Sequence, residues 1–357
     1  MASDHNMKRF DQVDGLRGIA CMLVIWRHVA DAFAEIAGSG LWVQQVAQNF
    51  NVGLIGVLAF FAISGYVIPS SLRGARVGGV KQFLTRRFWR LYPPFWFAVL
   101  VTWLMDLHSF SPERLVWNIT MIPSLGGETS AAGHFWTLEV ELVFYLIVAA
   151  LFLMIGKLGW KVIIPVFTLV GAWYVEWPIF PLEEHWRSIV LYLAVMFWGA
   201  CCREIMQFDF GNWVRSTRVN LARAIGLGLA SGLVLVRPLK SAYFAVIEGN
   251  ASLLGFGASS SLAILLFLFW VILTPVHSTF LARFGRWTYS TYLLHAVVFY
   301  GLLQIITVWD LTFFKGWPLM VYVLALIILC FGVGGLAYRW IELPSDRVGK
   351  RLSGKSR

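Results

Sequence analysis

Two ionisable side chains, Arg17 and His28, stand in the apolar segment DGLRGIACMLVIWRH at positions 14–28. On an α-helix, their separation places both within about 20° of one face and about 16 Å apart along the axis. Asp14 lies about 40° from this stripe, whereas Arg27 projects about 100° away from His28. Histidine exchanges protons readily near neutral pH, so the pattern predicts a catalytic His28 near the middle of a span, with Arg17 and Asp14 in line. A structural, hydrogen-bonded histidine is the alternative.

A second polar group follows the next apolar segment. Ser64 lies in FAISGY, and a basic loop leads from it to RRFWRLYP, in which Arg87 and Arg90 share one helix face. Arginine binds phosphate through paired hydrogen bonds. The two arginines are therefore candidates for binding a phosphorylated cofactor, with Arg17, Ser64 and Tyr92 as further candidates. Anchoring to lipid headgroups is the alternative.

Two glutamates, Glu139 and Glu141, interrupt the apolar stretch GHFWTLEVELVFY at positions 133–145. Thr137, Glu141 and Tyr145 are spaced four residues apart, so they share a helix face that Glu139 does not. A carboxylate here could orient an imidazole or take a proton from a hydroxyl substrate. The alternative is a structural partner for a buried arginine such as Arg27.

A late stretch, GRWTYSTYLLH, brings Tyr292 and His295 together three residues apart on one helix. We expect them to line a cavity wall, with a catalytic role as the alternative. Just after the last apolar segment, Arg339 and Glu342 predict a structural ion pair. The side chains expected to contact a substrate are Asp14, Trp136, Tyr145, Tyr292 and His295.

The composition is that of a membrane protein. The chain has 357 residues, 59% hydrophobic and 13% charged, with a mean hydropathy of +0.71, whereas a soluble protein carries roughly a quarter charged residues. Helices satisfy their own backbone hydrogen bonds in lipid, so the sequence predicts an all-α, polytopic membrane protein. About ten transmembrane helices are expected, at 15–36, 50–70, 91–109, 135–155, 162–176, 187–202, 221–236, 251–274, 287–309 and 318–338.

The net charge of +10 is distributed unevenly. Lysine and arginine concentrate in the N-terminal tail, in 71–90, in 203–223 and in the C-terminal tail, whereas 106–134 and 176–187 are poor in them. The positive-inside rule then places both termini in the cytoplasm. The basic excess therefore reflects topology rather than nucleic-acid binding. One transmembrane domain is expected over 1–345, followed by a basic cytoplasmic tail over 346–357.

Several motifs in order along the chain carry a family resemblance: DGLRGIACMLVIWRH, FAISGY, RRFWRLYP, WTLEVELVFY, GRWTYSTYLLH and IELP. Together they resemble the acyltransferase-3 family of integral membrane acyltransferases. Its elements read D-G-L-R-G-I-A with an H in line, F-x-x-S-G-[FY], R-R-x-x-R-[LI]-x-P, W-[ST]-L-x-x-E-x-x-F-Y, G-x-x-[ST]-Y-x-x-Y-L-x-H and E-x-P. The matches run from residue 14 to residue 344, almost the whole chain.

The resemblance implies an O-acyltransferase of the bacterial cytoplasmic (inner) membrane. It would take an acyl group, usually acetyl, from cytoplasmic acyl-CoA and deliver it to a hydroxyl, commonly of a surface or periplasmic glycan or glycolipid, without a metal. Carried over by position, His28 would be catalytic, with Arg17 in line and Glu141 as the motif carboxylate. Arg87 and Arg90 would serve the acyl-CoA side.

Two departures from the family pattern leave the mechanism open. Position 139 is Glu where small residues are common, and Arg27 adds a charge beside His28. Either Glu139 or Glu141 could therefore partner His28. The histidine could act as a general base or be acylated transiently.

Other functions stay open at this point. Many family members carry an extracytoplasmic hydrolase-like domain that this sequence lacks, so the spans would act alone or pass the acyl group to a partner protein. A proton-coupled secondary transporter, a lipid-linked sugar flippase and a non-enzymatic scaffold are the alternatives. No pair of Gly/Pro-broken segments recurs in matching halves, which disfavours a transporter of inverted repeats. Acceptor, acyl chain length and oligomeric state are not determined by the sequence.

Overall fold

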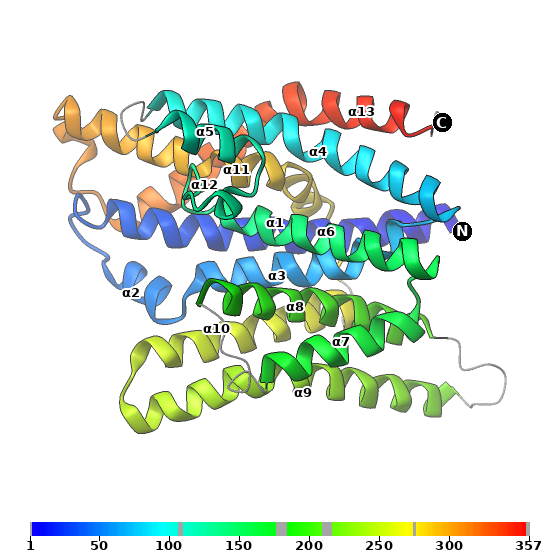
Figure 1. Ribbon diagram of the computed structural model, residues 1–357. Coiled ribbons are helices and arrows are strands. Elements are labelled where there is room, and N and C mark those ends of the chain that lie inside the picture. Colours follow the sequence, from blue (N-terminus) through cyan, green and yellow to red (C-terminus); the bar gives the residue numbers. More distant parts are fainter. Residues whose placement is uncertain (1, 106–109, 176–183, 209–215, 274–275, 355–357) are drawn as a thin grey trace. The chain divides into compact units, whose positions relative to one another are not determined.

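The structure is a computed structural model that describes residues 2–105, 110–175, 184–208, 216–273 and 276–354 (Figure 1). Its α-helices are α1 (Ala2–Phe33), α2 (Trp42–Asn49), α3 (Val52–Val67), α4 (Arg76–Met105), α5 (Pro112–Ile119), α6 (Trp136–Ile155), α7 (Trp160–Val175), α8 (Glu184–Gln207), α9 (Ser216–Glu248), α10 (Ala251–Phe267), α11 (Thr279–Val308), α12 (Leu319–Ala337) and α13 (Leu343–Leu352). Short 3₁₀ turns lie at Pro69–Ser71, Pro123–Gly126 and Thr312–Phe314, and π-helical turns at Leu268–Leu273 and Tyr338–Glu342. Apart from an isolated bridge between Ser39 and Pro318, the described residues form no strand, which confirms the all-α class.

Each of the ten expected apolar segments coincides with a helix: α1, α3, α4 and α6 to α12. Among the described residues, seven helical stretches are long and apolar enough to cross a membrane. The remaining three are α1 and α4, which carry several charged residues, and α7, which has 16 residues. The count of ten spans and the cytoplasmic placement of the termini stay predictions.

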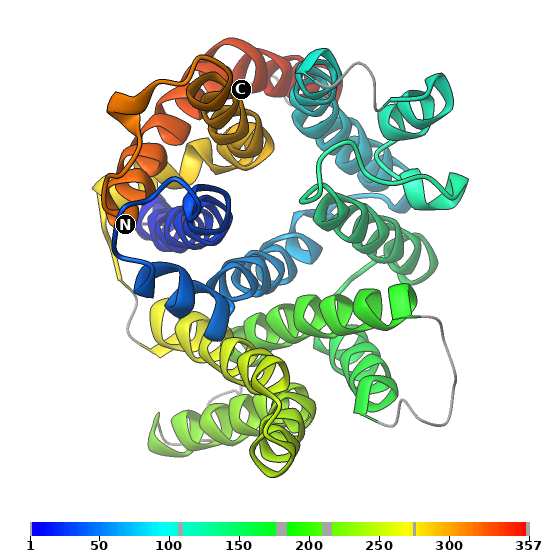
Figure 2. The same ribbon diagram turned by 90° about the vertical axis from the view of Figure 1, so that its left-hand side faces the viewer.

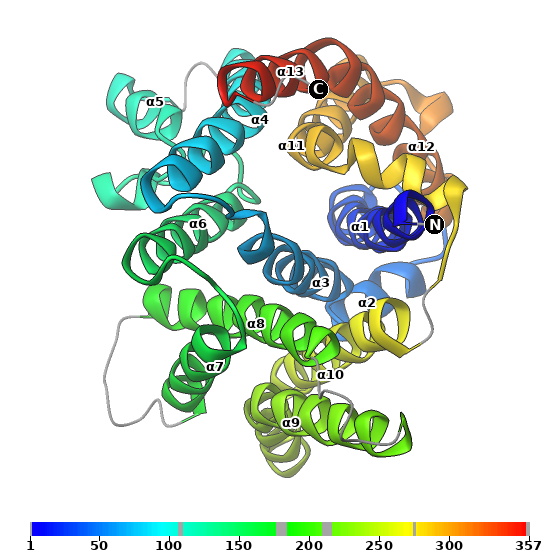
Figure 3. The same cartoon turned by 90° about the vertical axis from the view of Figure 1, so that its right-hand side faces the viewer.

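The helices form two compact units, each assembled from separate stretches of the chain. The first unit contains Met1–Gly56, Lys81–Glu139 and His277–Arg357, and the second contains Val57–Val80 and Val140–Val276. In the first unit, α1 packs along both α11 and α12, which also pack on each other (Figures 2 and 3). In the second, α7, α8 and α9 pack together and α10 packs on α9.

Small residues set the closest helix crossing of the first unit. A Cβ atom at Gly285 of α11 would overlap the backbone carbonyl of Asp14 on α1. Gly18 of α1 repeats the contact one turn further on, where a Cβ would lie 3.2 Å from the Leu281 carbonyl oxygen. Lipid provides no hydrophobic drive for helices to associate, so close backbone packing at small residues supplies much of the stability. The pair Gly18 and Gly285 therefore fixes how α11 lies against α1.

The second unit uses the same device. Gly65 of α3 lies against the Met196 carbonyl of α8, and Gly199 of α8 lies against the Ala62 carbonyl of α3. The two glycines are reciprocal, so each helix brings its backbone directly onto the other. This crossing holds the end of α3 that carries Ser64.

We predict that Gly285→Ala lowers the thermal stability of the purified protein in detergent. The added methyl group must displace the Asp14 carbonyl, and overpacking of this kind costs about 1–3 kcal/mol. Gly332→Ala is the matched control, because a Cβ at Gly332 on α12 meets nothing within 4 Å. Equal melting temperatures for the two variants would contradict the proposed crossing.

Candidate active site

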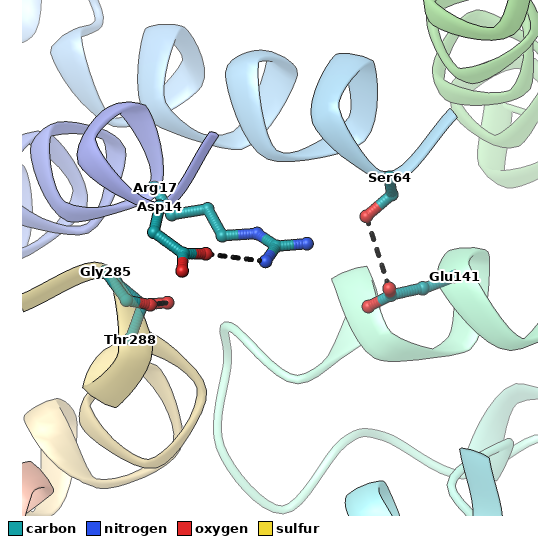
Figure 4. A network of polar contacts seen from close by, with 6 residues as sticks. All are labelled: Asp14, Arg17, Ser64, Glu141, Gly285 and Thr288. Carbon is teal, nitrogen blue, oxygen red and sulfur yellow. Dashed lines mark hydrogen bonds and ion pairs between the residues drawn. The ribbon is translucent and has the colours of Figure 1, made fainter. Parts of the chain in front are cut away.

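One end of the α1–α11 crossing carries the first predicted group, the Asp14–Arg17 pair. Arg17 Nη1 donates to Asp14 Oδ1 at 3.1 Å, as their spacing on one helix face allows (Figure 4). Gly285 lies against the Asp14 backbone, and the Thr288 hydroxyl donates to the Gly285 carbonyl at 2.7 Å. The position of this carboxylate–guanidinium pair is therefore set by the helix crossing itself.

Three histidine rings meet further along the same two helices. The ring centroids of His28 and His295 are 5.4 Å apart, those of His134 and His295 4.3 Å, and those of His28 and His134 6.5 Å. Phe299, one turn after His295, stacks nearly parallel to His28 at 6.4 Å between centroids. His28 is half-buried, whereas His295 and His134 are 1% and 5% exposed. His28 is therefore the most exposed of the three rings.

His28 lies five residues before the end of α1 at Phe33. That distance corresponds to about 7.5 Å of helix, so the ring is nearer the C-terminal end of α1 than its middle. The expected span begins at residue 15, well after the start of α1, so the predicted depth of His28 near the middle of the span stays a prediction. At this position on α1, His28 contacts His134, which belongs to the segment between α4 and α6.

Sequence reasoning missed His134. A single histidine in a polar loop shares no helical periodicity with His28, and only its place just before the WTLEVE motif could have drawn attention to it. Its backbone is firmly held. The Tyr292 hydroxyl donates to the His134 carbonyl at 3.0 Å, the Thr137 hydroxyl donates to the same carbonyl at 3.1 Å, and the two hydroxyls are 2.9 Å apart. Tyr292, predicted as a substrate contact, thus positions His134.

The segment that ends in His134 is built around a buried asparagine. Asn118 Nδ2 donates to the carbonyls of Arg114 and Thr129 at 2.9 and 3.0 Å, and its Oδ1 accepts from the Ala131 amide at 2.6 Å. The Asn118 side chain is therefore fully hydrogen-bonded to backbone on both sides of the segment. This network ties α5 to the residues that lead into His134.

Two aromatic residues of α4 attach the same segment to the helix. The Tyr92 hydroxyl donates to the Thr120 carbonyl at 3.1 Å, and Trp96 Nε1 donates to the Ile119 carbonyl at 2.9 Å. Tyr92 was expected to bind a cofactor. In the structure its hydroxyl holds the 110–135 segment, and a role with the cofactor stays a prediction.

The charged residues beside the histidines have partners of their own. The Ser124 hydroxyl donates to Glu139, which is 7% exposed. Arg27 pairs with Asp31 one turn later on the same helix, and Asp31 also accepts from Gln48 Nε2 at 2.9 Å. The expectation of a buried carboxylate for Arg27 was therefore wrong, because a half-exposed one lies within reach on its own helix.

In the second unit, Glu141 of α6 accepts two hydrogen bonds. The Ser64 hydroxyl donates to Glu141 Oε1 at 3.2 Å (Figure 4), and the Tyr145 hydroxyl donates to the same oxygen at 2.5 Å. The expected face shared by Glu141 and Tyr145 is present, and Ser64, predicted on the cofactor side, joins it. The carboxylate is half-buried, so one oxygen is held by hydroxyls at a site that solvent still reaches.

The two predicted cofactor arginines lie half-buried in the first half of α4. Arg87 lies over the ring of Phe83, with its guanidinium carbon 5.4 Å from the centroid. Arg90 lies close enough to Glu342 and Tyr338 to interact electrostatically. Trp136, the remaining predicted substrate contact, is half-buried at the first residue of α6.

The expected ion pair between Arg339 and Glu342 is absent from the described residues. Glu342 accepts instead from the Ser290 hydroxyl at 2.6 Å. The π-helical turn over Tyr338–Glu342 directs Glu342 into the core, where it is 3% exposed, and leaves Arg339 exposed. Such wide turns are frequent at functional sites.

Burial decides the ionisation of the loop histidine. Burial, followed by the neighbouring rings of His295 and His28, lowers the pKa of His134 well below the usual histidine value. The His134 ring is therefore neutral at pH 7. Within the described part of the chain, no group of three or more His, Cys, Asp or Glu side chains is arranged to hold a metal ion.

Comparison with known proteins assigns the family. The model of the acyltransferase-3 family, described as an acyltransferase domain, matches residues 10–339. This chain belongs to the acyltransferase-3 family. The matched range contains both the histidine cluster and the Ser64–Glu141–Tyr145 group, so the resemblance read from the motifs is confirmed. As a member with at least seven membrane-spanning candidates, the chain is an integral, multi-pass membrane protein.

Two curated relatives resemble the acyltransferase-3 chain. Peptidoglycan O-acetyltransferase OatA of Listeria monocytogenes is 28% identical over 199 residues, which is 47% of this chain and 29% of that protein. Acyltransferase MdmB of Streptomyces mycarofaciens is 24% identical over 387 residues, which is 96% of this chain and 93% of that protein. The match thus spans less than a third of the listerial protein and nearly all of the Streptomyces one. No solved structure matches the chain.

We predict that Asn118→Ala loosens the segment that carries His134. The substitution leaves the Ala131 amide and two backbone carbonyls without their partner, at a cost of about 1–3 kcal/mol for a buried unsatisfied group. Amide hydrogen exchange over residues 110–135 should accelerate and the melting temperature should fall. Asn49→Ala is the control, because Asn49 is exposed at the end of α2. Unchanged exchange in Asn118→Ala would rule out this role of Asn118.

Proposed function

We propose that this protein is a membrane O-acyltransferase that moves an acyl group, most simply acetyl, from cytoplasmic acyl-CoA to a hydroxyl of a surface or periplasmic glycan. Membership of the acyltransferase-3 family supports acyl transfer. One observation carries the proposal: the half-buried His28 contacts two buried histidines, and it lies on the same helix as the Asp14–Arg17 pair.

The donor side is assigned to the arginines. Arg87 and Arg90 are half-buried in the first half of α4, in a chain whose basic segments are expected on the cytoplasmic side. Guanidinium groups bind phosphates through paired, charge-assisted hydrogen bonds, which suits the phosphates of coenzyme A. Arg17, near the middle of α1, would add a third positive charge, although Asp14 already neutralises part of it.

The acceptor side is assigned to the residues around His134. Trp136 lies two residues after it, and aromatic rings such as this one can stack on sugars. The listerial relative is named for O-acetylation of peptidoglycan, which supports a glycan hydroxyl as acceptor. The Streptomyces relative carries only the name acyltransferase, so the acceptor class rests on the first comparison.

His28 is the residue proposed to work at the reacting atoms. It can remove the proton of the acceptor hydroxyl as that oxygen attacks the thioester carbonyl. Alternatively it can attack the thioester itself and pass the acyl group on. The two routes differ in whether an acyl-imidazole forms, which acid quenching and mass spectrometry of the protein after reaction with acyl-CoA alone would detect.

We predict that His28→Ala abolishes acceptor-dependent CoA release from acetyl-CoA by the detergent-solubilised protein. Loss of a general acid–base group reduces rates by about 10²–10⁴-fold. His277→Ala should retain activity, because His277 bonds at 3.1 Å to Gln12, which lies near the Asp14 end of the helix crossing and not near the His28 end. If wild type and His28→Ala release CoA equally with every glycan tested, the enzyme function is wrong. Solute uptake by proteoliposomes without acyl-CoA would then favour a transporter.

We also predict that Arg87→Gln and Arg90→Gln raise KM for acetyl-CoA with a smaller effect on kcat. Each lost charge-assisted hydrogen bond costs about 1.5–3 kcal/mol, or roughly a 10- to 100-fold weaker interaction. Arg86→Gln is the matched control, because its Nε donates to Ser353 at 2.8 Å near the C-terminus. A similar rise in KM for all three variants would indicate general electrostatic attraction instead of a specific site.

A further inference from the structure

Two buried imidazole nitrogens lie close to His28 without a hydrogen-bond partner in the part of the chain that the structure describes. They are Nε2 of His134 and Nε2 of His295. A buried polar atom without a partner costs about 1–3 kcal/mol. Such atoms are rare in folded proteins, and each one calls for an explanation. Two of them on rings 4.3 Å apart, next to the proposed catalytic histidine, indicate a shared function.

The proton on His295 is assigned by its backbone contact. Nδ1 of His295 lies 2.6 Å from the carbonyl oxygen of Tyr292. A carbonyl can only accept, so Nδ1 carries the hydrogen and Nε2 of the neutral ring carries the lone pair. His295 therefore presents a proton acceptor inside the cluster, with its ring orientation fixed by its own helix.

We propose that His295 and His134 form a proton relay behind His28. The proposal rests on the proposed acyl transfer, and it assigns the two residues a function that neither the family match nor the relatives' names specify. His295 is 5.4 Å from His28 between ring centroids, and His134 is 4.3 Å from His295. The two Nε2 atoms make no direct hydrogen bond, and at these ring separations one bridging water can carry a proton between the rings.

The relay serves the route in which His28 acts as a general base. As His28 takes the proton of the acceptor hydroxyl on one ring nitrogen, its other ring nitrogen gives up a proton to Nε2 of His295. The acceptor oxygen gains the bond to the acyl carbon, and the carbon–sulfur bond breaks with its electron pair on sulfur. The proton then returns through His28 to the thiolate. The hydroxyl proton has thereby been replaced by the acyl group and ends on CoA.

The rings of a relay must be neutral before they can accept a proton. The neutral state of His134, caused by its burial, meets this condition. The helices around the rings also carry Arg27, Glu139, Tyr292 and Cys330. Arg27 pairs with Asp31, and the Glu139 carboxylate accepts from the Ser124 hydroxyl. Arg27 is a cation beside His28, so it opposes a lasting positive charge on the rings, and burial of the rings does the same. The transferred proton is therefore held only until the leaving thiolate takes it.

The surrounding hydrogen bonds favour a relay over simple packing. Tyr292 contacts both residues: its carbonyl accepts from the His295 ring, and its hydroxyl donates to the His134 backbone. The His134 ring also interacts with the backbone of Tyr292 and Leu293. Thr137 joins the same hydroxyl. All of these bonds leave the two Nε2 atoms unused, so the scaffold orients the rings without satisfying them. A phenylalanine would fill the same space without leaving a polar atom unpaired.

The test compares two substitutions at each buried histidine with the wild-type protein. His134→Gln and His295→Gln keep a polar side chain that cannot carry a proton, whereas His134→Phe and His295→Phe keep a ring. Monodispersity and melting temperature identify the variants that fold. We expect kcat for CoA release to fall about 10- to 100-fold in every folded variant, with KM for acetyl-CoA changed less than threefold and a larger solvent deuterium isotope effect. His277→Gln is the control and should keep the wild-type kcat.

Different failures of the experiment are distinguishable. Wild-type kcat and isotope effect in the Phe variants, with loss only in the Gln variants, would show that the rings merely pack and would overturn the relay. Wild-type kcat in every variant would also overturn it, while a slow His28→Ala would leave acyl transfer standing. A wild-type protein no faster than His28→Ala would overturn the proposed function and the relay with it.

Discussion

The close crossing of α1 and α11 is the contact on which the first unit depends. Gly285 lies directly on the Asp14 backbone, and further along the same two helices His28 meets His295. The two contacts follow each other in the same order on both helices, so α1 and α11 run in the same direction. A single packing interface therefore sets both the carboxylate–guanidinium pair and the histidine cluster. Any change of the crossing would move the two groups together.

A second constraint is the need to satisfy polar backbone in a segment that leaves the helices. After α5, the 110–135 segment has only a short 3₁₀ turn, and Asn118 and the hydroxyls of Tyr92 and Tyr292 provide the partners that its carbonyls lack. The result is a loop tied by side-chain hydrogen bonds, with His134 near its end. Catalytic groups on loops are precise only when such supporting contacts exist.

The polar groups of both units illustrate how charge is tolerated among apolar helices. Arg27 finds Asp31 one turn away, Glu139 accepts from Ser124, and Glu141 accepts from hydroxyls in the second unit. A charge inside a membrane helix costs at least about 2.5–3.5 kcal/mol, so most are paired or hydrogen-bonded. Buried side-chain atoms without a hydrogen-bond partner occur at several places among the described residues, and the Nε2 atoms of His134 and His295 are two of them. These two lie on rings that contact each other and His28.

The sequence by itself determined the helical class, the positions of the ten long helices and the family, because hydropathy and helical periodicity are local properties. It also predicted the candidate residues His28 and Arg17, and the helix face shared by Glu141 and Tyr145 that the structure confirms. Only the tertiary structure decided that His134 joins His28 and that Glu342 turns inward to Ser290 instead of pairing with Arg339. The reason is physical. The contact between His28 and His134 joins residues more than a hundred positions apart in the chain, and it depends on a loop hydrogen-bond network that leaves no periodic pattern in the sequence. The inward turn of Glu342 depends on a π-helical turn, which changes the face that a residue occupies and has no sequence pattern that reveals it.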